Sequence, residues 1–297
     1  MRFLLTHTNS ILSKSSFSFD RYADIPDGHS FHGVPRYYRH SIHVLQRAIQ
    51  EWNNHQDLNF VINFGDIVDG KCPPGQSLDA VKKVNYEFQK SNRPVYHMIG
   101  NHCLYNLPRD KLLPLLKIPG LNGLAYYDFS PIPEYRIVVL DGYDISAIGW
   151  PQGHPKTLQA LEFLEKKNPN SDKKQPRRTA GPRQEICDDA TKLKQKVIVC
   201  CHLPFDDVAS DKEALLWNYD EVMNIIHQYN CVKACLSGHD HRGGYSIDSH
   251  GVHHRSFEAA LECPPDTDAY GHIDVYDDRL LLFGADRMQN TEMYFNS

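Results

Sequence analysis

Hydrophobic residues recur at helical spacing in several segments of the chain. Between residues 39 and 53 they fall at Ile42, Leu45, Ala48, Ile49 and Trp52, which share one face of an α-helix. We therefore predict a helix that buries this face. Similar patterns predict helices over residues 78–90, 158–167 and 218–228.

Short runs of apolar residues predict buried strands between these helices. The runs cover residues 59–64, 94–99, 135–140, 196–201 and 231–236, and glycine or polar residues follow each of them. Further strands are expected over residues 251–257, 272–276 and 279–283. Strands that alternate with helices indicate an α/β fold, and the strands that follow one another late in the chain indicate a mixed sheet.

The pattern weakens in three places, which set the expected domain boundaries. Residues 1–21 have no acidic residue before Asp20 and are expected to form a loose N-terminus. Residues 22–288 are expected to form a single domain, with an irregular basic linker at about residues 173–196. Residues 289–297 are expected to be a tail.

Composition excludes several classes of protein. The 297 residues carry a formal net charge of −5, and the pI is near 6.4, so bulk positive charge does not attract the chain to nucleic acid. No apolar run approaches the roughly 20 residues of a membrane span. The eight cysteines form no CxxC pair, which indicates reduced thiols and a cytoplasmic protein. We expect a monomer without nucleic-acid or membrane partners.

Polar residues of the kind that bind metal ions follow several predicted strands. They are Asp66, Asn101, His102, His202, His239 and His241. In open α/β sheets, sites form beyond the carboxyl ends of the strands. Oxygen and imidazole ligands without a thiolate suit Mn, Fe or Zn. Two ions about 3.5–4 Å apart are held most simply by one bridging carboxylate, and Asp66 is placed to supply it.

These segments also resemble a known family. Gly65-Asp66-Ile67-Val68-Asp69-Gly70, Gly100-Asn101-His102, the strand before His202 and Gly238-His239-Asp240-His241 resemble the motifs of calcineurin-like metallophosphoesterases. Residues 35–40, 216–219 and 241–245 are similar to those of one group within that superfamily, the manganese-dependent ADP-ribose/CDP-alcohol diphosphatases. The resemblance extends from about Tyr22 to Met288.

The resemblance implies a four-layer sandwich, with two mixed β-sheets flanked by helices. It implies two divalent ions bridged by Asp66, with Mn preferred and Zn or Fe possible. Asn101, His202 and His239 would hold one ion and His241 the other, while His102 would be catalytic at the leaving oxygen without binding metal. The implied small-molecule substrates are nucleotide diphosphates. The diphosphate bond of ADP-ribose or a CDP-alcohol such as CDP-choline would be hydrolysed to a nucleoside monophosphate and a phosphorylated sugar or alcohol.

The chain departs from the family in its first motif, which normally reads Asp-x-Gln or Asp-x-His. In the matching region Phe19 and Arg21 stand at the ligand positions, and Asp20 is one residue out of register. We therefore expect an asymmetric site with one weak or empty metal position, unless Asp20 replaces the displaced ligand. Two alternatives stay open: a catalytically impaired member that acts as a binding protein, and a general phosphodiesterase or phosphomonoesterase.

Further residues are candidates for supporting roles. Phe31 is a candidate to stack on a nucleobase, and Arg36 or Arg39 is a candidate to face the diphosphate. Asp69 and Asp240 are expected to orient metal ligands rather than bind metal themselves.

Overall fold

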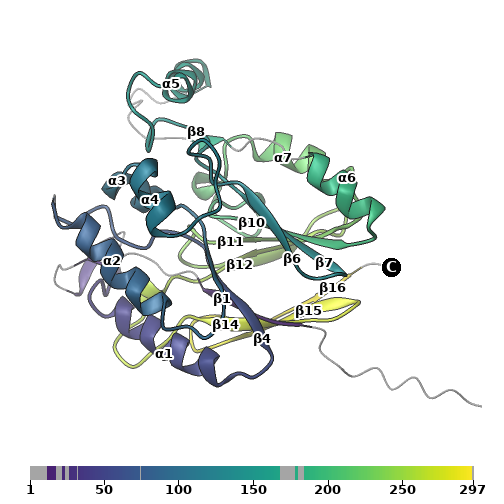
Figure 1. Ribbon diagram of the computed structural model, residues 1–297, viewed down its shortest axis with the longest axis horizontal. Coiled ribbons are helices and arrows are strands. Elements are labelled where there is room, and N and C mark those ends of the chain that lie inside the picture. The colour runs from purple at the N-terminus through teal and green to yellow at the C-terminus, as the bar shows by residue number, and fades with distance from the viewer. Residues whose placement is uncertain are drawn as a thin grey trace, which may run out of the picture.

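The computed structural model describes residues 12–17, 22–23, 27–31, 33–73, 75–167, 178–179 and 184–295. Two six-stranded β-sheets dominate this part of the chain, and helices cover their outer faces (Figure 1). The expected α/β fold, a four-layer sandwich of two mixed sheets between helices, is confirmed.

The first sheet has the strand order β16-β15-β14-β1-β4-β5. It is mixed, because β1 pairs in parallel with β4 and antiparallel with β14. Its strands are β1 (Leu12–Phe17), β4 (Leu58–Asn63), β5 (Val95–His97), β14 (Gly271–Val275), β15 (Arg279–Gly284) and β16 (Thr291–Tyr294).

The second sheet has the order β12-β13-β11-β10-β7-β6. Its four inner strands run parallel, and the two edge strands run antiparallel to their neighbours. The strands are β6 (Tyr127–Ile132), β7 (Tyr135–Leu140), β10 (Lys196–Cys201), β11 (Val232–Ser237), β12 (Gly244–Ile247) and β13 (His253–Ser256). Two short pairs, β2 (His29–Phe31) with β3 (Val34–Arg36) and β8 (Ile145–Ser146) with β9 (Arg178–Thr179), lie outside the large sheets.

Helices cover both outer faces of the sandwich. Figure 1 shows α1 (Ser41–Asn54) and α2 (Ser77–Phe88) beside the first sheet, and α6 (Gln184–Lys192) and α7 (Tyr219–Ile226) beside the second. α1 buries the apolar face that its spacing predicted, including Leu45 and Trp52. The remaining helices are α3 (Asn101–Asn106), α4 (Arg109–Leu115), α5 (Pro155–Lys167) and the 3₁₀ turns η1 (Lys212–Ala214) and η2 (Ala260–Glu262).

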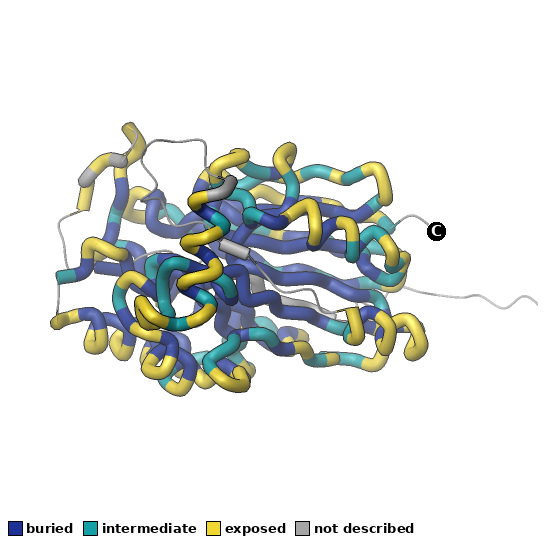
Figure 2. The backbone as a smooth tube through the Cα atoms, turned by 90° about the horizontal axis from the view of Figure 1, so that it is seen from above, coloured by how far each residue is buried: buried dark blue, intermediate teal, exposed yellow. Residues whose placement is uncertain are grey.

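The core lies between the two sheets, where Figure 2 shows buried strands beneath largely exposed outer helix faces. Aromatic rings join the sheets across this layer. The ring of Phe60 on β4 meets that of Phe129 on β6 edge to face at 5.1 Å, and Tyr96 on β5 stacks on Phe129 at 3.8 Å. Inner strands such as β7 and β10 are almost entirely buried, which explains their unbroken apolar sequence.

Three boundary expectations were wrong. Residues 12–17 are not part of a loose N-terminus: they form β1, whose backbone hydrogen-bonds to two strands, so tertiary pairing outweighs a polar sequence. The tail contains β16, in which buried Thr291 and Met293 alternate with exposed neighbours. The second part of the linker forms α6, because Cys187 and Ala190 lie three residues apart and are both buried.

Among the described residues, none of the helices has both the length and the apolar sequence that crossing a bilayer requires. All eight cysteines lie in this part of the chain and are free thiols.

Candidate metal centre

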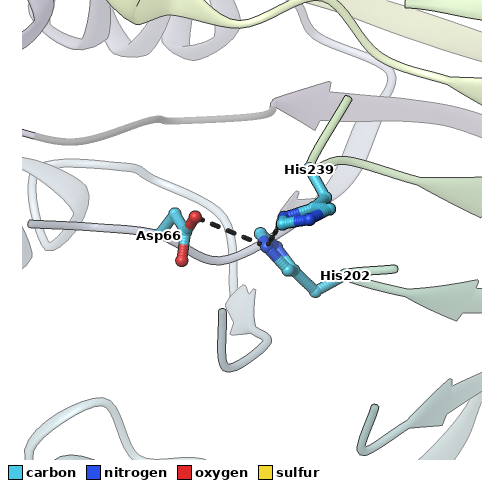
Figure 3. Close-up of side chains that lie close together, drawn as sticks. All are labelled: Asp66, His202 and His239. Carbon is cyan, nitrogen blue, oxygen red and sulfur yellow. Dashed lines mark hydrogen bonds and ion pairs between the residues drawn. The ribbon is translucent and has the colours of Figure 1, made fainter. Parts of the chain in front are cut away.

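Three of the predicted ligands converge beyond the carboxyl ends of parallel strands. Asp66 follows β4, His202 follows β10 directly and His239 follows β11. Asp66 Oδ2 lies 3.4 Å from His202 Nε2, and that nitrogen lies 3.1 Å from His239 Nδ1. The three side chains point toward one another in Figure 3. One ligand atom from each lies within 4.8 Å of the others, so a single ion can contact all three.

The orientation of His202 suits metal binding. Its Nδ1 lies 2.6 Å from the Phe64 carbonyl oxygen and donates a hydrogen bond to it. The proton of the neutral ring is therefore on Nδ1, and the lone pair of Nε2 faces Asp66 and His239. A backbone carbonyl that fixes the tautomer in this way is a regular partner of metal-binding histidines. His202 and Asp66 are both buried, so the donors lie in a region of low polarity.

Glycines make the close approach of these donors possible. A Cβ at Gly100 would lie 2.0 Å from Asp66 Oδ1, and a Cβ at Gly65 would lie 2.9 Å from His202 Nδ1. Gly65 also has φ of +102°, which a side chain disfavours. With carboxylate and imidazole donors in this cradle, the residues present fit a divalent ion such as Mn²⁺ or Zn²⁺.

Asp66 and His239 both have a strained backbone. Their φ angles are +52° and +67°, in the left-handed region that non-glycine residues occupy at a cost of about 1–3 kcal/mol. A hydrogen bond of 2.8 Å from the His102 amide to Asp66 Oδ1 helps to hold the first of these turns. Strain of this kind concentrates at functional sites, which favours a functional role for both residues.

Asn101 is held at the edge of the centre by Tyr143, whose hydroxyl donates to the Asn101 amide oxygen at 3.2 Å. Tyr143 is fixed in turn by Asp141, whose Oδ1 accepts its backbone N–H at 3.0 Å. Arg109 binds the same carboxylate through two hydrogen bonds, of 2.6 and 3.1 Å. Burial favours the neutral acid, but the charge and hydrogen bonds of Arg109 outweigh it and lower the pKa of Asp141.

His102 lies beside the centre on α3 and has its own set of partners. Its Nδ1 accepts a hydrogen bond from the Gly70 amide at 2.7 Å, and Asp69 Oδ2 is 3.2 Å from the same nitrogen. The shorter contact is with the amide donor, so we assign the proton of the neutral ring to Nε2. Asp69 therefore lies next to a candidate catalytic group, whereas the sequence-based expectation was that it orients a metal ligand.

His241 is not part of the group of three. Its Nδ1 lies 2.8 Å from Glu262 Oε1, and Arg287 donates to the other oxygen of Glu262 at 3.1 Å. Glu262 and Arg287 also line a cavity of about 610 Å³, together with Tyr37 from the loop before α1. The volume is typical of small-molecule sites, which span roughly 300–1,000 Å³. His241 thus contacts a residue that lines this cavity.

Comparison with known proteins agrees with this arrangement. Residues 24–243 match the calcineurin-like phosphoesterase family, a span that contains all the predicted ligands. The chain belongs to this family. A protein of Arabidopsis thaliana named manganese-dependent ADP-ribose/CDP-alcohol diphosphatase is 64% identical to it, over 92% of this chain and 93% of its own length. A protein of the same name from Oryza sativa is 56% identical, over 98% and 99%.

A solved structure also resembles this chain over nearly its whole length. A dimetal phosphatase from Danio rerio is 27% identical, covers 97% of this chain and 100% of its own, and superposes with a TM-score of 0.88. The sequence-based assignment to the ADP-ribose/CDP-alcohol diphosphatase group is confirmed by these relatives.

Several supporting residues of this family member escaped sequence analysis. Tyr143, Arg109 and Glu262 belong to no motif, and their roles depend on contacts between segments far apart in the chain. Asp141 offered a signal, since it ends a strand as the ligands do, but Asp-Gly is also an ordinary turn. Asp240 accepts backbone N–H groups of Asp211 and Arg242, at 2.7 and 3.2 Å.

Two sequence-based expectations lie outside the described residues. Asp20 and the rest of the displaced first motif, residues 18–21, are not among them, and neither is the side chain of Phe31. Tyr22, the next described residue, forms a parallel bridge with Val68, two residues after Asp66.

Proposed function

We propose that this chain hydrolyses the diphosphate bond of ADP-ribose and CDP-alcohols in a manganese-dependent reaction. The products are a nucleoside monophosphate and a phosphorylated sugar or alcohol. The observation that carries the proposal is the convergence of Asp66, His202 and His239 within 4.8 Å, in a chain related over almost its whole length to proteins named for this activity.

Asp66, Asn101, His202 and His239 are the residues that would hold one divalent ion, and His241 with Asp66 would hold a second. When bound, two such ions lower the pKa of a water molecule and neutralise the phosphoryl oxygens. The protein contributes a buried and preorganised set of donors, in which hydrogen bonds from Tyr143 and to Phe64 orient Asn101 and His202.

His102 is the proposed general acid. Hydrolysis breaks the bond between one phosphorus and the bridging oxygen, and that oxygen leaves as a phosphate that needs a proton or a hydrogen bond. The assigned proton on His102 Nε2 is available for this step, because Nδ1 is occupied by the Gly70 amide. The 2.8 Å hydrogen bond from the His102 amide to Asp66 ties the position of the acid to that of the ligands.

The cavity beside Glu262 is proposed to receive the part of the substrate beyond the reacting phosphate. Its charged lining groups are Glu262, Asp266, Asp286 and Arg287. Three carboxylates against one guanidinium favour a cationic or hydroxyl-rich group, such as choline or ribose, over a further phosphate. A substrate in this cavity would contact Glu262, whose side chain in turn contacts that of His241.

The two metal positions are proposed to differ in affinity. One has four candidate protein ligands, whereas the other has Asp66 and His241, since the residues at the usual first-motif positions are Phe19 and Arg21. Metal content per chain after dialysis against buffer without manganese tests this directly. One retained ion per chain supports the asymmetry, and two tightly held ions contradict it.

A panel of three substrates tests the activity itself. ADP-ribose, CDP-choline and bis-p-nitrophenyl phosphate are incubated with the full chain and Mn²⁺. Release of AMP from ADP-ribose and of CMP from CDP-choline, faster than nitrophenol release, is the expected result. Preference for bis-p-nitrophenyl phosphate would identify a general phosphodiesterase. No hydrolysis of any substrate by folded protein would contradict the proposal.

A further inference from the structure

A second group of imidazoles surrounds one carboxylate far from the centre described above. His227 caps the carboxyl end of α7, Asp248 and His250 lie in the turn between β12 and β13, and His254 lies on β13. β13 runs parallel to β11, and this group lies at the amino ends of the two strands. His239 follows the carboxyl end of β11, so the two groups lie at opposite ends of the sheet.

The ring nitrogens converge on one oxygen of Asp248. His227 Nε2 lies 2.8 Å from Asp248 Oδ2, and His254 Nε2 lies 3.1 Å from the same oxygen. The ring of His250 stacks on that of His227, with centroids 3.7 Å apart and planes at 12°. One ligand atom from each of His227, Asp248 and His250 lies within 4.8 Å of the others.

The carboxylate is fixed and ionised. Asp248 Oδ1 accepts the backbone N–H groups of His250 at 2.8 Å and Val252 at 3.0 Å, which leaves Oδ2 directed at the imidazoles. Burial would raise the pKa of Asp248, but hydrogen bonds from His227, His254 and these amides outweigh it and lower the pKa to about 2. A carboxylate anion held in place is a ready ligand for a divalent ion.

His254 supports the carboxylate rather than adding a ligand. Its Nδ1 is buried and has no hydrogen-bond partner among the described residues. A proton there would be buried without an acceptor, which is costly, so the ring carries its proton on Nε2 and donates it to Asp248. This is the carboxylate–histidine arrangement that orients metal ligands.

His227 and His250 remain as nitrogen donors. A metal-binding imidazole is neutral and ligates through the ring nitrogen that has no proton, so His227 would carry its proton on Nδ1 when its Nε2 binds the ion. Two imidazoles and a carboxylate are a common protein ligand set for zinc. With Zn–N and Zn–O bonds near 2.1 Å, tetrahedral ligand atoms lie roughly 3.4 Å apart. His250 is exposed, so its ring can rotate and shorten the distances between the ligand atoms, which are now within 4.8 Å, to this spacing.

We propose that His227, Asp248 and His250 bind a zinc-type transition-metal ion at this second site. Such an ion would tie the carboxyl end of α7 to the turn between β12 and β13. Its function would be structural, because a site at the amino ends of the strands lies away from Asp66 and His202. The inference does not depend on the proposed hydrolytic activity.

The test counts zinc ions bound to the full chain by equilibrium dialysis. An Asp66→Asn background weakens zinc binding at the catalytic centre, so that the second site dominates. His250→Ala is added to this background, and His43→Ala provides the matched control, since His43 is another exposed histidine and lies on α1. His250→Ala is expected to weaken zinc binding by at least about 10–100-fold, the loss that accompanies removal of even an outer partner of a ligand. His43→Ala is expected to leave it unchanged.

Equal zinc affinity in the Asp66→Asn chain with and without His250→Ala would overturn the proposal, as would the absence of any zinc bound to folded Asp66→Asn protein. Thermal unfolding gives a second readout. Zinc should raise the melting temperature of Asp66→Asn protein, and the rise should disappear with His250→Ala, because binding to the folded state alone stabilises it. A chain that binds zinc here yet hydrolyses no ADP-ribose would refute the proposed function and leave this site intact.

Discussion

The hydroxyl of Tyr143 donates a hydrogen bond of 3.2 Å to the amide oxygen of Asn101. Tyr143 is completely buried, and its ring also lies 6.0 Å from that of His202. One aromatic side chain therefore orients one candidate ligand and packs beside another. Behind it, the buried pair of Arg109 and Asp141 fixes the backbone of Tyr143. The candidate metal centre therefore has a support that reaches beyond its candidate ligands.

Removal of the Tyr143 hydroxyl tests this support. Tyr143→Phe should weaken Mn²⁺ binding about 10–100-fold while the protein stays folded, because Asn101 loses its orienting partner. Manganese titration with hydrolysis as the readout measures the effect. Tyr127→Phe is the control, since the Tyr127 hydroxyl is also buried but donates to the His97 carbonyl, at 2.9 Å. Equal manganese affinity in the two variants would contradict the role given to Tyr143.

Gly100 should tolerate no side chain. A Cβ there would lie 2.0 Å from Asp66 Oδ1, so Gly100→Ala must displace the carboxylate. We expect a large loss of manganese binding and of activity. Gly153→Ala is the matched control, because a Cβ at Gly153 has no atom within 4 Å. Normal metal content and activity in Gly100→Ala would show that the carboxylate need not sit where the structure places it.

Loss of Arg109 should destabilise the fold. Arg109→Met leaves the buried Asp141 carboxylate without its cation, which costs roughly 3–5 kcal/mol of unfolding free energy. Lys192→Met removes a cation from an exposed pair with Asp189, and should cost about 0–1 kcal/mol. Urea unfolding at pH 7 compares the two. Similar urea midpoints for Arg109→Met and Lys192→Met would mean that the buried pair contributes little to the free energy of unfolding.

The contribution of Asp141 to the free energy of unfolding should decrease as the pH falls. Its pKa in the folded chain is lower than its ordinary value of 3.8, so the stabilisation is fully present above that value. It is lost as the pH falls through the lower folded-state pKa. Urea unfolding of the wild type and Arg109→Met should therefore differ most at neutral pH and less in acid below pH 3.8. A difference that grows on acidification would contradict this sign.

His102→Ala should separate chemistry from metal binding. If His102 is the general acid, kcat falls about 100- to 10,000-fold. Metal content should stay normal, because the backbone N–H of residue 102 still donates to Asp66 Oδ1 in the variant. Turnover and bound manganese are measured on the same preparation. Loss of the metal together with the activity would assign His102 to the ligand set instead.

Much of the fold followed from local patterns. Inner strands such as β7 and β10 are apolar throughout, and α1 presents a clear apolar face, so both types were recognised. β1 was missed because Leu12–Phe17 is largely polar and becomes a strand only through its neighbours β4 and β14. Short elements such as α3 and β12 are too brief to show a period.

The site was predictable where a ligand follows a strand. Asp66, His202 and His239 stand shortly after apolar runs, and a glycine precedes Asp66 and His239. The fold brings the carboxyl ends of these strands together, so the three side chains meet. Their partners were not predictable in the same way. Glu262 reaches His241 across 21 residues, and Arg109 reaches Asp141 across 32, so only the folded chain shows these contacts.

The proposed activity is tested most directly by AMP release from ADP-ribose by the wild type and by Asp66→Asn, each with and without Mn²⁺. Manganese-dependent AMP release is expected from the wild type and is expected to be lost in folded Asp66→Asn protein, since an amide replaces the carboxylate that is proposed to bridge the two ions. Undiminished release by Asp66→Asn, or none by manganese-loaded wild type, would contradict the proposed activity.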